Sequence, residues 1–243
     1  MTVDDVRVLH SRSRPSNHVE HDAAAVGAPA PATAPVVEIA DFGGLTVAFD
    51  ERVLRPREWT VMQSQWAREL LPTLPDGDVL ELCAGVGHIG LCAVLGSERR
   101  LLMVDASEVA CRYAGLNTQH ARLSQQVDIR CGPMERCLDP RERFALVIAD
   151  PPWVPSGSCD AFPEDPLHAI DGGADGLDLA RTVLQVIGTH LLPWGAALLQ
   201  LGDTDQVRAV EHELRSAPEL DLEVADHRPG AGGCIVLLRR RSL

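Results

Sequence analysis

Residues 78–90 read DVLELCAGVGHIG, a short apolar run followed by a loop of small residues. DVLEL is typical of a buried strand, and the HIGLCAVLG that follows the loop has helical spacing. Gly85 and Gly87 lie between the two, where glycine lets the backbone approach a ligand at the start of a helix. We therefore predict a strand, a ligand-binding loop and a helix. Taken alone, this spacing is equally typical of a tight strand-to-helix turn without a ligand.

Apolar runs alternate with helical patterns on the C-terminal side of this stretch. We predict strands in residues 101–105, 127–131, 144–150 and 195–202, and helices in 107–123, 176–192 and 203–215. Residues 220–226 and 233–240, separated by HRPGAGG, indicate a hairpin. This alternation predicts an α/β fold with a Rossmann-like, mostly parallel seven-stranded sheet, helices on both faces and a C-terminal antiparallel hairpin.

The N-terminal part divides at about residue 36. Residues 1–35 are rich in alanine and proline without periodicity, so we expect a disordered tail, or alternatively a partner-binding arm. Residues 36–243 form one predicted domain. It begins with a hairpin around Gly43 and Gly44, followed by a helix whose Trp59, Met62, Trp66 and Leu70 are expected to face the core.

The composition excludes several classes of function. Of the 243 residues 45% are hydrophobic, the formal charge is −13, and every basic residue is an arginine. An acidic surface repels phosphate backbones, so a nucleic-acid partner is disfavoured. Seven cysteines without a CxxC pair indicate a reduced, cytoplasmic protein, and we expect neither a metal site nor a membrane segment.

Acidic side chains at two strand ends indicate which cofactor the loop would bind. Asp105 ends the strand after the glycine loop, where a carboxylate accepts hydrogen bonds from both hydroxyls of a ribose. Glu81 precedes the loop itself and would repel a pyrophosphate. The pair therefore favours S-adenosyl-L-methionine, which carries an ammonium and a sulfonium.

With ADPPW at the end of a later strand, the sequence resembles the class I S-adenosylmethionine-dependent methyltransferases. More narrowly, it is similar to the protein-glutamine N5-methyltransferases that modify release factors. Five segments carry this resemblance in order: VLRPREWTVMQSQWA, VLELCAGVGHIGL, MVDASEVACRYAGLN, DPPWVP and DGGADGLDLARTVL. They spread over most of the chain from about Val36 to Arg239.

The resemblance implies roles for individual residues. Glu81, Gly85 and Gly87 would contact the methionyl part of the cofactor, Asp105 the ribose, and Ala106 would lie beside the adenine. It also implies cofactor contacts for Cys83, Ala84, Met134 and Asp150.

Departures from the family pattern bear on both ligands. Cys83 replaces a glycine, Pro133 stands where many relatives carry an acid for the adenine amino group, and Gln200 stands where glutamate is usual. The family's Asn-Pro-Pro-Tyr motif is DPPW in this sequence. Its helical N-terminal domain, which helps to dock release factors, corresponds to the short alanine-proline segment.

Asp150, Pro151, Pro152 and Trp153 form the predicted catalytic corner. The Asp150 carboxylate and the Pro151 carbonyl would orient an acceptor nitrogen, the prolines would stiffen the turn, and Trp153 would offer a flat wall for stacking. Ionised aspartate only accepts hydrogen bonds, whereas asparagine also donates and so complements a carboxamide. We therefore expect N-methylation of a small molecule or peptide.

Three alternatives remain open at this point. Protonated Asp150 would restore the donor and with it a protein glutamine acceptor. DPPW also resembles the motif of adenine-N6 nucleic-acid methyltransferases. A non-catalytic subunit with the cofactor fold is the third alternative, mildly favoured by Pro133.

Overall fold

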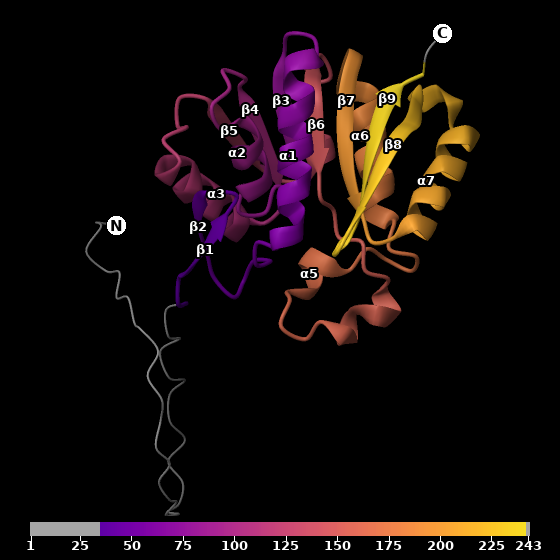
Figure 1. Ribbon diagram of the computed structural model, residues 1–243. Helices are drawn as coiled ribbons and strands as arrows, with labels where there is room; N and C mark the ends of the chain where they lie inside the picture. The colour runs from indigo at the N-terminus through magenta and orange to yellow at the C-terminus, as the bar shows by residue number, and fades with distance from the viewer. Residues whose placement is uncertain (1–34, 242–243) are drawn as a thin grey trace, which may run out of the picture. The chain divides into compact units, whose positions relative to one another are not determined.

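A computed structural model describes residues 35–241, in which seven strands form one sheet in the order β5-β4-β3-β6-β7-β9-β8 (Figure 1). Strands β5 to β7 in this order run parallel, and β9 is antiparallel to both of its neighbours. This confirms the predicted sheet and its C-terminal hairpin. The strands are β3 (Asp78–Leu82), β4 (Leu101–Asp105), β5 (Val127–Cys131), β6 (Phe144–Ala149), β7 (Leu191–Leu201), β8 (Leu222–Gly230) and β9 (Gly233–Arg240).

Helices cover both faces of the sheet, as predicted, because successive strand residues point to opposite sides. In β3, Val79 belongs to one buried cluster, whereas Leu80 and Leu82 belong to the other. The first cluster is covered by α1 (Val61–Leu70), α2 (His88–Val94) and α3 (Glu108–His120). The second is covered by α4 (Met134–Cys137), α6 (Asp178–His190) and α7 (Thr204–Ser216).

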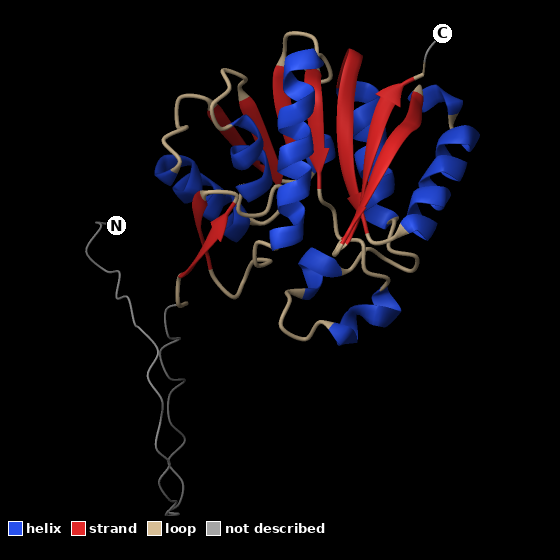
Figure 2. Cartoon of the chain, viewed as in Figure 1, coloured by secondary structure: helices blue, strands red, loops and turns tan. Residues whose placement is uncertain are grey.

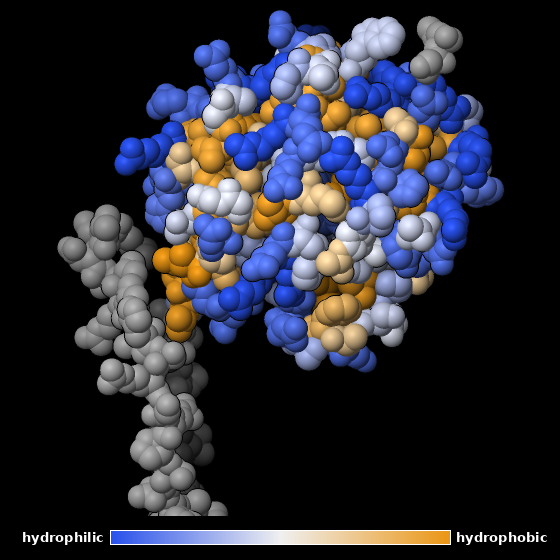
Figure 3. All heavy atoms as spheres, in the orientation of Figure 1, coloured by the Kyte–Doolittle hydropathy of each residue, from blue (hydrophilic) through white to orange (hydrophobic). Residues whose placement is uncertain are grey.

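The N-terminal hairpin joins the first of these clusters. β1 (Glu38–Phe42) and β2 (Leu45–Phe49) pair antiparallel around Gly43 and Gly44, as predicted. Figure 3 shows mostly hydrophilic side chains on the face in view, with hydrophobic atoms gathered beside β1. Val36 and Ile39 are exposed there, at 76% and 65%.

Two local expectations were wrong. Trp66 is buried and Met62 and Leu70 pack against the core, but Trp59 is 38% exposed. It lies in the tighter 3-10 turn Glu58–Thr60, which rotates it away from the buried face of α1. The turn expected over residues 227–233 is shorter, since β8 and β9 stay paired up to Gly230 and Gly233. The edge position of β8 tolerates Pro229 within the strand.

The parallel strands end level with one another, and this positions the site. Leu82 of β3 pairs with Val104 of β4 and with Ala149 of β6. The residues that follow these strands therefore meet where the strands have their carboxyl ends, and we call this side of the sheet the carboxyl edge. Asp105 and Asp150 belong to this edge.

A segment between β6 and α6, residues 150–177, lies across that edge (Figures 1 and 2). It consists of loops, the 3-10 helix η4 (Ser156–Ala161) and the short α5 (Leu167–Ile170). Its own small core contains Val154, Cys159 and Ile170. We call it the insertion.

No helix among residues 35–241 is long and apolar enough to cross a membrane. The predicted tail of residues 1–35 lies outside the described residues, apart from Pro35.

Candidate active site

A cavity of about 350 Å³ opens beside the glycine loop, and we call it the loop cavity. Most of the residues predicted to bind the cofactor line it, because they follow the ends of β3, β4, β5 and β6. These are Cys83, Ala84, Gly85, Asp105, Ala106, Met134 and Asp150. Pro152 of the predicted corner also lines it. Sequence reasoning missed other lining residues: Val53, Leu54, His88, Ile89, Glu135 and His168.

The glycine loop is held in left-handed backbone conformations. A side chain on Gly85 (φ +53°) would meet nothing within 4 Å, so its absence leaves the backbone open to a ligand. At Gly87 (φ +79°), a Cβ would lie 2.8 Å from the Met103 sulfur. Gly87 therefore serves close packing rather than ligand access. Cys83 also has a positive φ, of 54°, which agrees with the glycine that the resembled family carries there.

Asp105 fixes the loop relative to β4. Its Oδ2 accepts a hydrogen bond from the Gly85 amide at 2.7 Å, and its Oδ1 accepts one from the Ser107 amide at 2.8 Å. A carboxylate has about four lone-pair sites, so acceptor positions remain for two ligand hydroxyls. The arrangement fits a ribose next to Gly85.

Glu81 lies below α2 rather than among the residues that line the loop cavity. Its Oε1 accepts a hydrogen bond from the Gly90 amide at 2.9 Å, and its Oε2 has no partner among the described residues. Burial raises the pKa of Glu81 to about 8. This placement could have been predicted from the alternation of side chains along a strand. Glu81 lies two residues after Val79 and so shares its face of β3, which α2 covers.

Asp150 stands between the loop cavity and a second cavity of about 200 Å³, the corner cavity, because it lines both. Burial raises the pKa of Asp150 to about 7. The corner cavity brings together all four predicted catalytic residues, which begin the insertion, with later residues of the insertion and with the segment before α1. Its other lining residues include Leu54, Arg57, Trp59, Phe162, Glu164, Asp165 and Ile170.

The indole of Trp153 is held from behind by the β7–α7 connection. A Cβ on Gly202 would lie 2.5 Å from the Trp153 ring, so the ring packs on bare backbone. Gln206 donates to the Trp153 carbonyl at 2.9 Å and to the Asp175 carbonyl at 3.1 Å. Its own side-chain oxygen accepts the Gly202 amide at 2.7 Å. Gln206 thus fixes the main chain that carries the wall of the corner cavity.

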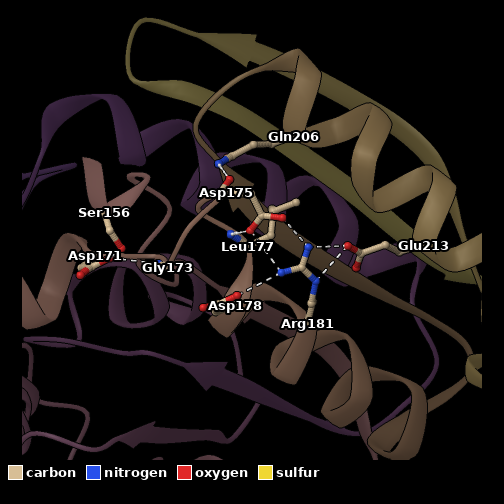
Figure 4. A network of polar contacts seen from close by, with 9 residues as sticks. All are labelled: Ser156, Asp171, Gly173, Asp175, Leu177, Asp178, Arg181, Gln206 and Glu213. Atoms are coloured by element: carbon tan, nitrogen blue, oxygen red, sulfur yellow. Dashed lines mark hydrogen bonds and ion pairs between the residues drawn. The ribbon is translucent and has the colours of Figure 1, made fainter. Parts of the chain in front are cut away.

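The acidic segment 171–178 has structural partners (Figure 4). Asp175 and Asp178 both pair with Arg181, which also pairs with Glu213 of α7. Asp171 accepts hydrogen bonds from the Ser156 hydroxyl and the Gly173 amide. These contacts give the three aspartates a role in holding the loop.

An ion pair closes the corner cavity on the side of the insertion. Arg57 donates to both carboxylate oxygens of Asp165, whose side chain is only 7% exposed. The Arg57 guanidinium also lies 5.5 Å from the centre of the Trp59 ring. This ion pair therefore connects the segment before α1 to the insertion at the wall of the corner cavity.

Comparison with known proteins supports the sequence resemblance. No family model matches the chain. It is 26% identical, over 83% of its length, to the ribosomal protein uL3 glutamine methyltransferase of Francisella tularensis. It is 31% identical, over 72% of its length, to the release factor glutamine methyltransferase of Mycolicibacterium smegmatis. The chain spans 65% and 63% of these two relatives, less than two thirds of either.

Solved structures show the same fold. The catalytic domain of hMettl16, in complex with an RNA hairpin, has a TM-score of 0.63 and 13% identity, over 81% of this chain and 75% of that one. The ribosomal protein L11 methylase of Lactobacillus delbrueckii has a TM-score of 0.56 and 13% identity, over 78% and 82%. At this identity they establish the Rossmann-like methyltransferase fold alone. The sequence relatives confirm the resemblance to protein-glutamine methyltransferases.

Proposed function

We propose that this protein is an S-adenosylmethionine-dependent methyltransferase that modifies the side-chain amide nitrogen of a glutamine in a protein. The observation that carries the proposal is the place of Asp150, at the junction of a cavity that fits the cofactor and a cavity that fits an acceptor side chain. The names of the sequence relatives favour this acceptor over the small molecule expected from the changed corner.

The loop cavity fits the proposed cofactor. Its volume of about 350 Å³ lies within the usual range of small-molecule sites. Ala106, Pro133 and Met134 would enclose the adenine, and the free acceptor positions of Asp105 would receive the ribose hydroxyls. When bound, the cofactor supplies an electrophilic methyl group on a sulfonium. The chain's own residues orient it and exclude water from it.

Burial of Asp150 changes the hydrogen-bond count that argued against glutamine. That count assumed an ionised carboxylate, which only accepts. A carboxyl group with a pKa of about 7 is protonated in a large fraction of molecules at neutral pH. In this form it donates one hydrogen bond and accepts another, as the amide of asparagine does. DPPW then complements a carboxamide nearly as well as the family's asparagine motif.

The corner would act chiefly by orientation. The Asp150 O–H would donate to the amide oxygen of the acceptor, while the Pro151 carbonyl would accept one of its N–H hydrogens. Pro151 and Pro152 have no N–H of their own, so no backbone donor competes at this turn. Holding the nitrogen in line with the methyl group supplies the main rate advantage in such a displacement.

The lining of the corner cavity suits one side chain of a polypeptide. Trp59 and Phe162 are partly exposed, at 38% and 37%, while Ile170 closes the interior. An aliphatic stem would pack between these apolar groups and carry its amide to Asp150. Its volume of about 200 Å³ lies below the usual range of small-molecule sites.

The test compares acceptor classes. The full chain is incubated with S-adenosylmethionine and with glutamine peptides from release factors and ribosomal protein uL3, small amines and heteroaromatics, or adenine-containing oligonucleotides, and S-adenosylhomocysteine is measured. Turnover of glutamine peptides by wild type and Asp150→Asn, but not by Asp150→Ala, is expected. Turnover confined to amines or to adenine would replace the proposed acceptor. Absence of cofactor binding would overturn the enzymatic proposal and leave a supporting subunit.

A further inference from the structure

His88 is a polar side chain in the loop cavity whose role the proposed function does not yet explain. It is the first residue of α2, directly after Gly87, and it lines the cavity. Its ring meets the Phe42 ring edge to face, with centroids 4.6 Å apart and planes at 86°. This contact with β1 fixes the plane of the imidazole.

Neither ring nitrogen of His88 has a hydrogen-bond partner within residues 35–241, and Nδ1 is sealed from solvent. Burial lowers the pKa of His88 to about 3, so the ring is neutral and carries one proton. A buried N–H without an acceptor is rarer than a buried acceptor without a donor. The proton therefore belongs on Nε2, which leaves Nδ1 bare on the sealed side and gives this cavity-lining ring an N–H donor at the nitrogen that is not sealed.

The order of the strands determines which part of the cofactor lies beside this donor. Pro133 and Met134 follow β5, Asp105 ends β4, and Asp150 follows β6. β3 lies between β4 and β6, so the loop after β3 lies between the adenosine contacts and the reaction centre. The methionyl part, with its carboxylate and ammonium, would then extend over this loop and the start of α2.

We infer that Nε2–H of His88 donates a hydrogen bond to the carboxylate at the amino-acid end of the cofactor. The inference rests on the proposed cofactor. Glu81, the nearest acid in the sequence, is turned under α2 toward the Gly90 amide. The wall at the start of α2 therefore presents a neutral donor to an anionic group and no competing carboxylate.

Calorimetry with three ligands isolates this contact. S-adenosylhomocysteine carries both carboxylate and ammonium, its decarboxylated analogue keeps only the ammonium, and 5′-methylthioadenosine has neither. His88→Phe keeps a ring against Phe42 but removes the donor. This variant is expected to lower the affinity for S-adenosylhomocysteine about tenfold or more, as for a lost hydrogen bond to a charged group. Its affinity for the other two ligands should stay unchanged.

A pair of amide variants gives a second readout that does not depend on the behaviour of phenylalanine. Glutamine places its N–H near the position of Nε2, whereas asparagine places it near Nδ1. His88→Gln is therefore expected to retain S-adenosylhomocysteine affinity within about threefold, and His88→Asn to lose it as His88→Phe does. Thermal unfolding of each variant confirms that the full chain is folded.

Two results would overturn the inference. Equal weakening of all three ligands would show that His88 only shapes the cavity, and unchanged affinity in both His88→Phe and His88→Asn would show no contact. Both require that the wild type binds S-adenosylhomocysteine. If the wild type binds neither this ligand nor 5′-methylthioadenosine, the proposed cofactor itself is wrong, which is a separate result.

Discussion

The two cavities that meet at Asp150 are built in different ways. The loop cavity is formed where parallel strands in matched register end. The backbone amides of Gly85 and Ser107 hold the carboxylate of Asp105 there. The corner cavity is formed by segments outside the sheet, and side-chain contacts such as Arg57 with Asp165 hold them together. The first therefore depends on the fold itself. The second depends on individual side chains and can change its acceptor without a change of fold.

The largest effect is expected where a side chain supports the backbone of the loop cavity. Asp105→Ala removes the acceptor for two loop amides and for the ribose hydroxyls. Two lost contacts to a charged group predict a loss of S-adenosylhomocysteine affinity of at least about 100-fold, measured by calorimetry. Asp105→Asn, which keeps one acceptor, should lose less. Equal affinity for S-adenosylhomocysteine in Asp105→Ala and wild type would show that Asp105 does not hold the loop cavity, and would contradict the account of how this cavity is built.

The next effect tests the junction between them. Asp150→Ala should lower kcat with a glutamine peptide about 100-fold, as for other positioned hydrogen-bond donors, while S-adenosylhomocysteine affinity changes little. Asp150→Asn should keep most of the activity. A large loss of cofactor affinity in Asp150→Ala would assign this residue to the loop cavity instead.

The pH dependence of the same enzyme shows which form of Asp150 acts. Burial raises its pKa to about 7, and the proposed arrangement needs the protonated form, so kcat/KM should fall as the pH rises through about 7. A bound sulfonium would move the midpoint to lower pH without reversing the direction. Asp150→Asn should show no such fall. A rate that rises with pH in the wild type only would indicate that the ionised form acts, as an amine acceptor requires.

A smaller effect is expected at the ion pair between Arg57 and Asp165, which holds the wall of the corner cavity. Arg57→Leu breaks the ion pair with Asp165 and should raise the KM for the peptide about tenfold, because the insertion no longer holds the wall in place. S-adenosylhomocysteine affinity should stay within about twofold, since only the acceptor side is disturbed. Arg208→Leu removes an exposed pair with Asp205 and serves as the matched control. An equal effect of both variants would argue against this role of the ion pair.

A separate effect, on stability rather than on binding or rate, is expected beneath the loop cavity. Glu81 has a pKa of about 8 when folded, against an ordinary value of 4.5, so the stability of the native protein falls as the pH rises between these values. Glu81→Gln cannot ionise, so it does not lose this stability. The Tm of Glu81→Gln relative to the wild type should therefore rise between pH 5 and pH 9, by about 2–4 °C for each kcal/mol of unfolding free energy that the wild type loses. Glu223→Gln, at an exposed position of β8, is the control. Parallel curves for wild type and Glu81→Gln would mean that Glu81 is ionised when folded.

The loop cavity was largely predictable from the sequence, because its residues follow apolar runs. Asp105, Ala106 and Asp150 each end or follow a strand, and parallel strands bring such ends together. His88 was not predicted, since one histidine at the start of a helix has no distinctive spacing. Its contact with Phe42 joins segments that no local pattern connects.

The corner cavity was predictable only in part. DPPW was visible, but Arg57 and Asp165 are 108 residues apart, and nothing periodic links them. The protonation of Asp150 depends on burial, which requires the packed structure. This is why hydrogen-bond counting from the sequence favoured an amine acceptor.

The contacts of Gln206 have a consequence for attempts to redesign acceptor choice. Its side chain joins the carbonyls of Trp153 and Asp175 to the amide of Gly202, so the acceptor wall takes its position from the β7–α7 connection. A mutant library that varies Trp59, Phe162 and Glu164, which line the corner cavity, would alter the shape of the recess while keeping this support. One that also varies Gln206 would mix changes of shape with loss of the support, and its inactive members would reveal nothing about acceptor preference.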